Sequence, residues 1–275
     1  MDTIDRQDWA VGASFTAYGL RIGVRANTEQ ALSAVVESLP LGLKRKDVSE
    51  VDLLYSVVAG NKEQTNRLRR FSLAYANSTQ LVRSLQFGDV PEAVERDLSI
   101  EIAELAKNRV FIHAGVVGWK GNAILIPGRS RAGKSTLVAA LLRAGASYYS
   151  DDFGVVDRRG FVHPYQRPLQ LRNSDGTTRR VPAADLLAEV GTKPLRVRLV
   201  LIAQYRKRAS WRPIELRPGE GLLAVLTNTV SAQRQPARAL KTLAAMLAGA
   251  LVLKGTRGEA ERMVALLREA GHLAL

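Results

Sequence analysis

A glycine-rich stretch near the middle of the chain limits the possible folds more than any other feature. Residues 128–136 read Gly-Arg-Ser-Arg-Ala-Gly-Lys-Ser-Thr and fit the pattern G-x-x-x-x-G-K-[ST]. An apolar run suited to a strand, residues 123–126, precedes the stretch, and a helical pattern of leucines that ends near Gly145 follows it. A chance match to the four fixed positions is expected in roughly one chain of this length in a hundred. The sequence therefore predicts an α/β fold with a phosphate-binding P-loop between a strand and a helix.

The residue types of this stretch suit the phosphates of a nucleotide. Gly128 and Gly133 allow the backbone to turn its N–H groups toward phosphate oxygens at the positive end of the following helix. Lys134 would reach the terminal phosphates, and the hydroxyl of Ser135 would complete the shell of a Mg²⁺ ion. The predicted nucleotide-binding set is Gly128, Arg129, Ser130, Arg131, Ala132, Gly133, Lys134, Ser135 and Thr136.

Composition excludes several other classes of protein. The 275 residues include no cysteine, so disulfides and cysteine-based zinc or iron–sulfur sites are excluded. The first nine residues carry acids where a secretory signal needs bases and an apolar run. The longest apolar stretch, residues 243–253, is much shorter than the ~20 residues of a membrane span. These features predict a cytoplasmic protein that does not enter a membrane.

The chain is strongly basic, with a formal net charge of +14. Such a charge favours an acidic partner: a nucleotide, nucleic acid, an acidic peptide or an anionic surface. The arginine-rich stretches 158–180 and 193–217 could form a cleft for an acidic substrate, and a solvated basic surface is the alternative. Nucleic acid is the least favoured partner, because the sequence contains no named nucleic-acid module and no stacking aromatics interleaved with the basic residues.

The predicted elements divide into two domains. Residues 1–100 read as a small α+β domain without a chemical motif, and residues 101–275 read as the P-loop domain. The first domain is predicted to contain a hairpin over 11–26, a helix over 28–39, strands over 51–58 and 68–75, and a helix over 91–107.

The second domain is predicted to alternate strands and helices around the P-loop. Its predicted strands are 110–119, 122–126, 146–157, 161–163, 198–205 and 211–216. Residues 164–195 are predicted to be an exposed loop region with one short helix near 183–190. Helices are predicted over 220–229, 236–249 and 258–270, and the Ala- and Leu-rich residues 240–253 suggest a buried helix.

Two adjacent carboxylates, Asp151 and Asp152, supply the second chemical signal. They follow Lys134 by 17 and 18 residues and close the strand that comes after the P-loop helix. Phosphoryl transfer needs a carboxylate to hold Mg²⁺ and, in a kinase, a base for the acceptor hydroxyl. Neighbouring residues of an extended strand point to opposite sides, so the two aspartates are expected to differ in role.

Three segments together resemble the catalytic domain of HPr kinase/phosphorylase, a family related by fold to phosphoenolpyruvate carboxykinase. These segments are His113-Ala-Gly-Val-Val, the stretch 128–136 and Tyr149-Ser-Asp-Asp152. The spacings between the three segments also agree with the family pattern. The resemblance is therefore close over residues 108–157. It implies a carboxykinase-like P-loop kinase domain that uses ATP and Mg²⁺, phosphorylates a serine hydroxyl and forms homo-oligomers.

By the same resemblance, Asp151 would accept the proton of the acceptor hydroxyl, Asp152 with Ser135 would hold Mg²⁺, and His113 would support the aspartates. The assignment of the two aspartates to the two roles is left open. Residues 162–172 lack the Glu-Ile-Arg-Gly-Leu-Gly-like segment of the family, which argues against HPr as the substrate and against the reverse reaction. The better match is to divergent HPr-kinase-related proteins, which include kinases that act on the terminal serine of lasso peptides.

The predicted function is therefore a Mg²⁺- and ATP-dependent kinase for a serine of a peptide or protein, with a small-molecule kinase and a non-catalytic nucleotide sensor as alternatives. Arg129, Arg131 and Arg257 could each meet phosphate, or could be solvated surface arginines. His163 and His272 have no partners at the spacing of a metal site and are expected to be structural.

Overall fold

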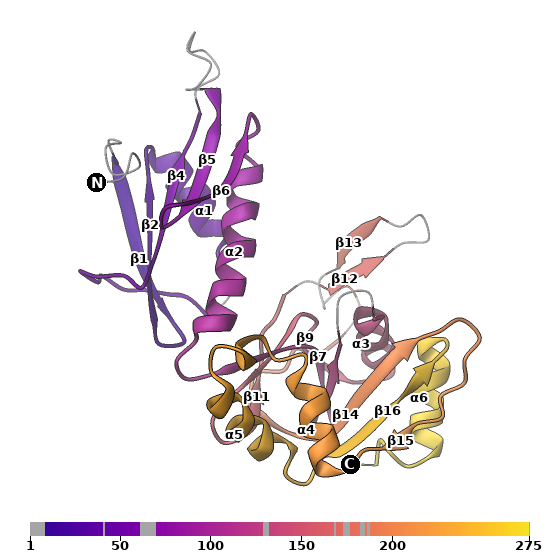
Figure 1. The fold of residues 1–275 in the computed structure, drawn as a ribbon. Coiled ribbons are helices and arrows are strands. Elements are labelled where there is room, and N and C mark those ends of the chain that lie inside the picture. Colours follow the sequence, from indigo (N-terminus) through magenta and orange to yellow (C-terminus); the bar gives the residue numbers. More distant parts are fainter. Residues whose placement is uncertain are drawn as a thin grey trace. The chain divides into compact units, whose positions relative to one another are not determined.

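The chain forms two compact units, Met1–Asn108 and Arg109–Leu275. The computed structural model describes residues 9–40, 42–60, 70–128, 132–167, 169–172, 177–181, 185 and 188–274. Each unit has its own sheet and its own core (Figure 1).

The first unit is built on a sheet that is mostly antiparallel. Within its described residues the strand order is β3-β1-β2-β4-β5-β6, and only β2 and β4 run parallel. The strands are β1 (Val11–Ala17), β2 (Leu20–Ala26), β3 (Lys44–Arg45), β4 (Leu53–Val58), β5 (Ser72–Ala76) and β6 (Thr79–Ser84). Tyr18 and Gly19 adopt positive φ in the turn between β1 and β2, which confirms the predicted hairpin.

Helices α1 (Glu29–Ser38) and α2 (Asp89–Leu105) pack against each other and against this sheet. The hydroxyl of Thr28 accepts a hydrogen bond from the amide of Ala31 and so caps α1, as Thr and Ser do at helix starts. The buried residues of α1, Ala31 and Val35, are four apart and therefore share one face. Strand β6 was not predicted, because its polar sequence carries little of the apolar signal of a strand.

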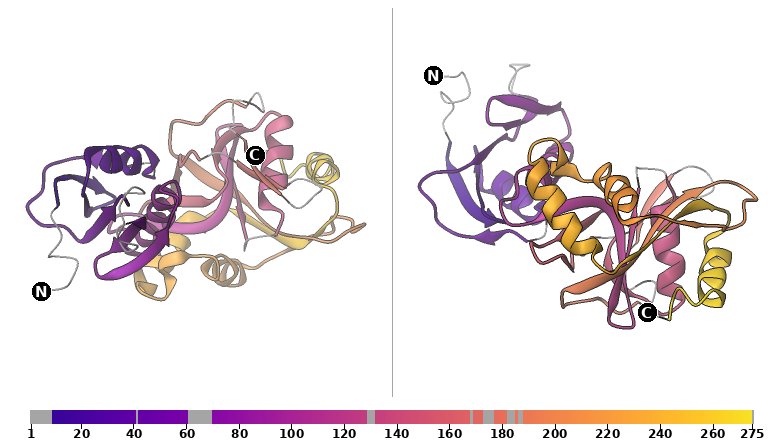
Figure 2. Two further views of the ribbon diagram at one scale, coloured as in Figure 1. Left: turned by 90° about the horizontal axis from the view of Figure 1, so that it is seen from above. Right: turned by 60° about the horizontal axis from the view of Figure 1, so that its bottom comes forward.

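The second unit is a mixed sheet with helices on both faces (Figures 1 and 2). In its described residues the strand order is β11-β10-β7-β8-β14-β16-β15, and β8, β14 and β16 run parallel. The strands are β7 (Val110–Trp119), β8 (Asn122–Pro127), β9 (Ser147–Ser150), β10 (Phe153–Val156), β11 (Phe161–His163), β14 (Leu195–Tyr205), β15 (Ile214–Glu215) and β16 (Leu251–Arg257). The helices are α3 (Lys134–Arg143), α4 (Pro218–Leu226), α5 (Pro236–Leu247) and α6 (Ala260–Glu269).

Alternating residues of the central strands divide the core of this unit into two layers. Ile124 and Ile126 of β8 pack with α3 and α6, whereas Ala123 and Leu125 pack with α4 and α5. This alternation is the period of two expected of a strand that is covered on both faces. The parallel carboxyl ends of β8, β14 and β16 consequently meet at one edge of the sheet, which is where such folds place their sites.

Three details of the second unit differ from the sequence predictions. Residues 146–157 form two strands, β9 and β10, because Asp151 and Asp152 interrupt the pairing with β7. The predicted loop region contains a hairpin of β12 (Leu169–Arg172) and β13 (Thr178–Val181), and most of the predicted helix near 183–190 lies outside the described residues. The predicted buried helix over 240–253 is wrong at its end, since α5 stops at Leu247 and Leu251 begins the central strand β16.

Across the residues that the structure describes, no helix has both the length and the apolar character needed to cross a membrane.

Candidate functional site

The glycine-rich stretch connects the end of β8 to the start of α3. The amide of Gly128 donates to the carbonyl of His113 at 3.1 Å, which fixes the start of the loop against β7. Gly133 caps α3 in the left-handed region, at φ 83°, where a Cβ would also lie 2.5 Å from the Arg257 guanidinium. The loop therefore needs glycine at this position for both its backbone conformation and its packing.

Lys134 is the first residue of α3, and its ammonium group donates to the carbonyl of Gly128 at 2.7 Å. Burial lowers the pKa of Lys134, while the nearby charges of Asp151 and Asp152 raise it. The lysine thus folds back over the loop and lies in the field of both aspartates. Among the other predicted binding residues, Ala132 and Ser135 are half-buried, Thr136 is exposed, and Arg129, Ser130 and Arg131 lie outside the described residues.

Asp151 and Asp152 lie beside β7, at the break between β9 and β10. The residues that flank the break remain in register, with Ser150 opposite Val116 and Phe153 opposite His113. The carbonyl of Asp152 accepts a hydrogen bond from the amide of Ala114 at 3.2 Å. The break therefore brings both carboxylates to the strand that also contacts the P-loop.

The Asp151 carboxylate is buried, with 7% of the residue exposed. Burial raises its pKa to about 6, whereas hydrogen bonds from Ser135 and from the amide of Gln170 lower it. The Gln170 amide donates to Oδ2 at 3.1 Å, and Oδ1 has no hydrogen-bond partner among the described residues. A buried carboxylate oxygen without a donor is costly unless a cation or a donor binds there.

Asp152 differs from its neighbour in exposure and in partner. Its side chain is 41% exposed, and its carboxylate forms an ion pair of 3.0 Å with the Arg167 guanidinium. Arg167 is itself held by its carbonyl, which accepts a hydrogen bond from the hydroxyl of Tyr148. Asp152 is thus the carboxylate that a molecule arriving from solvent can reach.

His113 is the exposed residue of the otherwise buried strand β7. Partial desolvation of the imidazole lowers the pKa of His113, and Asp152 opposes this shift through its charge and through a hydrogen bond at its backbone. The imidazole packs on the ring of Phe153 with centroids 4.8 Å apart, next to the aspartate pair. The structure therefore brings His113, Lys134 and the two aspartates together, in agreement with their spacing in the sequence.

The resemblance implies that Ser135 and Asp152 hold the metal and leaves the roles of the two aspartates open. In the structure Ser135 lies next to Asp151, and a hydrogen bond from its hydroxyl lowers the pKa of that carboxylate. The physical reason is that Asp151 turns into the interior under β12, whereas Asp152 turns out toward Arg167. Sequence reasoning also missed Arg167 and Gln170 as individual residues, because nothing distinguishes them from the other polar residues of their segment.

Arg257 ends β16 on the other side of the P-loop. Its guanidinium donates to the carbonyl of Gly133 at 2.7 Å and to that of Gly258 at 2.7 Å, and only 1% of the residue is exposed. The idea of a solvated surface arginine is therefore wrong at this position. Burial lowers the pKa of Arg257, and its Nε has no hydrogen-bond partner among the described residues.

His163 does not contribute to the site. The ring of His163 lies 2.8 Å from the Asp157 carboxylate, in the turn between β10 and β11.

Among the described residues, no group of three or more His, Asp or Glu side chains forms a metal cage. Mg²⁺ does not require such a cage, because it is usually held by one or two carboxylates together with water and substrate phosphates.

The residues present fit a Mg²⁺–nucleotide pair. The unpartnered Oδ1 of Asp151 and the adjacent hydroxyl of Ser135 are hard oxygen ligands, which Mg²⁺ prefers. The α3 N-terminus, the Gly133 cap and Lys134 provide the backbone and the charge for phosphate oxygens.

Comparison with known proteins adds little to this geometry. No protein-family model matches the sequence, and no curated protein matches it either. Among solved structures, the Hpr(Ser) kinase/phosphatase from Coxiella burnetii matches with a TM-score of 0.29 and 16% sequence identity, over 60% of this chain and 94% of that chain. Because the TM-score and the identity are both low, the argument for function rests on this chain's own residues.

Proposed function

We propose that this chain is an ATP- and Mg²⁺-dependent kinase of the HPr-kinase-related type that phosphorylates a hydroxyl, in particular a serine of a peptide or protein. The observation that carries the proposal is the buried Asp151 carboxylate beside Ser135, with Oδ1 unpartnered and Lys134 close by. A carboxylate, a hydroxyl and a lysine around a glycine loop are the groups that P-loop enzymes use for phosphoryl transfer. The catalytic part is Arg109–Leu275, and Met1–Asn108 is a separate domain.

The two aspartates take the roles that their surroundings allow. Asp151 and Ser135 would hold Mg²⁺, because they face each other and Asp151 is shielded from the acceptor. Asp152 would accept the proton of the acceptor hydroxyl, because it is the exposed carboxylate. His113 and Arg167 would position Asp152, one through its backbone and the other through the ion pair.

The reaction then follows from these positions. The acceptor oxygen forms a bond to the γ-phosphorus while its proton passes to Asp152. The bond from the γ-phosphorus to the bridging oxygen breaks, and its electrons leave on ADP. Mg²⁺, when bound, neutralises the charge that develops on the phosphate oxygens. Lys134 stabilises the same charge from the loop side.

The first test of this proposal uses the purified chain with Mg²⁺ and γ-labelled ATP, offered to a panel of serine-containing peptides and small hydroxyl metabolites. Label on a peptide serine is the expected result. Label on a metabolite alone would change the substrate class to a small molecule. Bound ATP without transfer to any acceptor would indicate a non-catalytic sensor and overturn the kinase.

The roles of the aspartates are separated by two matched variants. Asp152→Asn is expected to lower transfer by ~10²-fold or more, the usual size of general-base catalysis, with little change in ATP affinity. Asp151→Asn is expected to weaken the Mg²⁺ dependence of ATP binding as well as transfer. The reverse pattern, with Mg²⁺ dependence lost only in Asp152→Asn, would restore the assignment expected from the family resemblance.

A further inference from the structure

A cavity lined by positive charge lies at the carboxyl end of β14. Its volume is about 410 Å³, and it is lined by the loop after β14 and by Thr256 of β16. Four of the lining residues are cations: Arg206, Lys207, Arg208 and Arg212. In the described part of the chain, no acidic side chain lines this cavity, which we call the basic pocket.

The four cations of the basic pocket have no counter-charge of their own. All four are exposed, and none forms a side-chain hydrogen bond or ion pair with any residue that the structure describes. Glu259, which follows β16, accepts a hydrogen bond from the hydroxyl of Tyr205 at 3.2 Å instead. Like charges this close together repel one another, so the binding of an anion would lower the free energy of the loop.

The backbone at Arg208 singles out this cation. The amide of Ala209 donates to the carbonyl of Arg206 at 3.0 Å and closes a turn in which Arg208 is the third residue. Arg208 has a φ of 63°, in the left-handed region that glycine or asparagine normally occupies in turns. An arginine at such a position destabilises the turn relative to glycine. What the arginine adds in return is its charge in the basic pocket.

The loop that presents these cations is held at both ends. The amide of Arg206 donates to the carbonyl of Arg257 at 2.8 Å. Trp211 is 7% exposed and belongs to the core layer of α3 and α6. The folded chain therefore keeps the four charges together before any ligand binds.

The lining of the basic pocket suits carboxylates better than a nucleotide or a nucleic acid. None of the described residues that line it is aromatic, so it offers no surface on which a base can stack. Guanidinium groups pair with carboxylates through two parallel hydrogen bonds. Three arginines and one lysine within residues 206–212 are therefore suited to several carboxylates along one peptide.

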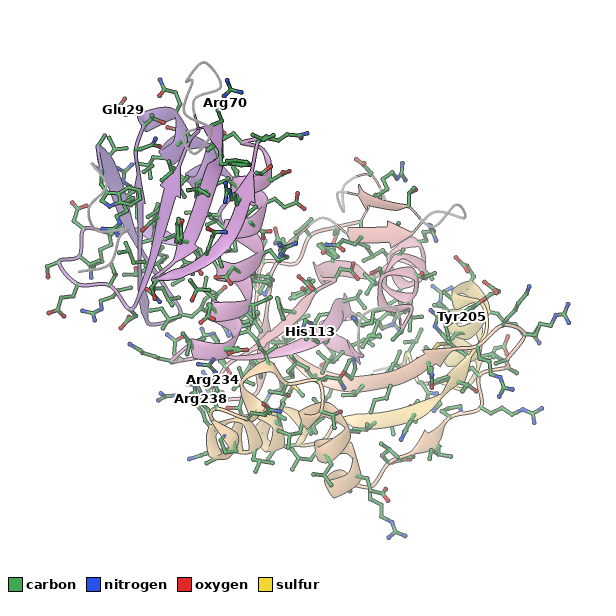
Figure 3. All side chains as sticks on the ribbon, turned by 45° about the horizontal axis from the view of Figure 1, so that its top comes forward. Glu29, Arg70, His113, Tyr205, Arg234 and Arg238 are labelled. Carbon is green, nitrogen blue, oxygen red and sulfur yellow. The ribbon has the colours of Figure 1, made fainter. Side chains whose placement is uncertain are left out.

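The basic pocket and the aspartates lie at the same edge of the sheet. Strand β7 is antiparallel to both β8 and β9, and β8 is parallel to β14, so β8, β9 and β14 end at one edge. Three steps in the pairing order separate β9 from β14, which is about 14 Å at ~4.8 Å per step. Figure 3 shows Tyr205, which precedes Arg206, well apart from His113, which lies beside the aspartates.

We infer that the basic pocket binds an acidic segment of the acceptor peptide or protein, at a distance from the serine that reacts. An extended chain advances at most ~3.6 Å per residue, so at least about four residues separate that segment from the serine. This inference rests on the proposed function, because the acceptor hydroxyl is taken to lie at Asp152.

The first test measures the binding of fluorescein-labelled hexa-glutamate to the full chain by anisotropy, at physiological ionic strength. Arg208→Gly is expected to weaken binding about fivefold and to raise the midpoint of urea unfolding, because glycine suits the positive φ. A loss of affinity together with a gain in stability excludes unfolding as its cause.

Lys120→Gly is the matched control for Arg208→Gly. Lys120 is also exposed, has a φ of 47° and lies outside the basic pocket, so this change removes the same charge and relieves a similar backbone conformation. It should leave the affinity for hexa-glutamate within about twofold of wild type. Equal losses in the two variants would reduce the binding to general attraction by a basic chain and overturn the inference. Displacement of the peptide by saturating Mg²⁺–ATP, or tighter binding of oligothymidylate, would overturn it as well.

The second test connects the basic pocket to phosphoryl transfer. Serine peptides carry four glutamates after an alanine spacer of two or eight residues, and labelled ATP gives KM and kcat for each. The long spacer is expected to lower KM about fivefold with kcat unchanged, and Arg208→Gly should abolish that difference. Equal KM values for both spacers in wild type would overturn the inference while leaving the kinase intact. No transfer to any peptide, with hexa-glutamate binding as expected, would overturn the proposed function and leave the pocket as a site for an acidic peptide.

Discussion

The two sides of the P-loop bury opposite charges, and neither charge forms a direct ion pair among the described residues. On the aspartate side, Asp151 is buried with one carboxylate oxygen unpartnered among the described residues. On the β14–β16 side, Arg257 is buried with its guanidinium on two carbonyls, and no carboxylate is among its hydrogen-bond partners in the described part of the chain. Both arrangements cost folding free energy, because a buried charge is less well solvated than one in water.

The difference between the sides indicates which ligand each one meets. The buried carboxylate of Asp151 favours the binding of a cation. The exposed cations that line the cavity after β14 favour the binding of an anion; they are Arg206, Lys207, Arg208 and Arg212. A Mg²⁺ ion fits the first side, and an acidic segment of the acceptor fits the second. The free-energy cost of burying both charges is consistent with a site organised for a ligand rather than for stability alone.

The largest effect is expected from the removal of Lys134, the charge of the P-loop that lies between the two sides. Lys134 follows the glycine cap of α3 and lies in the field of both aspartates, so Lys134→Ala removes the loop's own charge on the phosphates. Transfer is expected to fall by roughly 10³-fold, the upper range for one lost electrostatic contact. Single-turnover transfer from labelled ATP measures this loss. Lys254→Ala, an exposed lysine of β16, serves as the control and should retain full transfer.

The next largest effect concerns the aspartate side and is seen in how the free energy of unfolding depends on pH. Burial raises the pKa of Asp151 from 3.8 to about 6, so the folded chain holds this proton more tightly than the unfolded chain does. Stability from this group is therefore full below pH ~4 and is lost as the pH rises to about 6, by about 3 kcal/mol in total. Asp151→Asn should remove that loss. The free energy of unfolding of the variant should therefore rise relative to that of the wild type between pH 4 and 7.

Urea unfolding at several pH values, without nucleotide or Mg²⁺, gives the comparison. Asp152→Asn is the matched control, because its carboxylate is exposed and its charge raises the pKa of Asp151 less than burial does, so most of the pH slope should remain. If the free energy of unfolding of wild type and of Asp151→Asn changed with pH in parallel, the burial of the Asp151 carboxylate would not cost stability.

The aspartate side was largely predictable from the sequence, because its chemistry is local to a motif. Gly128, Lys134, Ser135, Asp151 and Asp152 fall at spacings that a strand, a loop and a helix bring together. Which aspartate meets Ser135 was not predictable, since it depends on a two-residue break in pairing with β7 and on the hairpin above it.

The other side was not predictable in the same way. Arg257 approaches Gly133 across 124 residues of sequence, and the parallel pairings of β8 with β14 and of β14 with β16 bring them together. The sequence predicts no strand here: residues 251–253 read as the end of a buried helix over 240–253, because the Ala- and Leu-rich run before them has no clear break until Gly249. Arg257 could therefore be named as a candidate phosphate contact only by its residue type, because without β16 the sequence gives it no position beside the loop.

A smaller effect tests whether Arg257 serves the loop or only the fold. Arg257→Met keeps most of the side-chain volume but loses the bonds to Gly133 and Gly258. The lost bonds are partly offset by removal of a buried charge, so stability should fall by only about 1–2 kcal/mol. ATP affinity should fall about tenfold, because the Gly133 cap loses its support.

Calorimetric ATP titration and thermal unfolding of the same samples distinguish the two roles. Arg257→Lys retains the charge but cannot donate in the planar fork of a guanidinium, so it should bind ATP as poorly as the methionine variant. A stability loss with unchanged ATP affinity would make Arg257 a residue of the fold alone.

The smallest expected effect concerns Tyr205, whose ring and hydroxyl can be separated. The hydroxyl lies 3.2 Å from the Glu259 carboxylate in an exposed pair, and such bonds contribute little to stability. Tyr205→Phe should therefore change the free energy of unfolding by less than about 0.5 kcal/mol and ATP affinity by less than about twofold. Tyr205→Ala removes the ring that lies under the Arg257 guanidinium and next to Gly133, and it should weaken ATP several-fold. If the phenylalanine variant lost as much ATP affinity as the alanine variant, the Glu259 bond rather than the aromatic surface would position the loop.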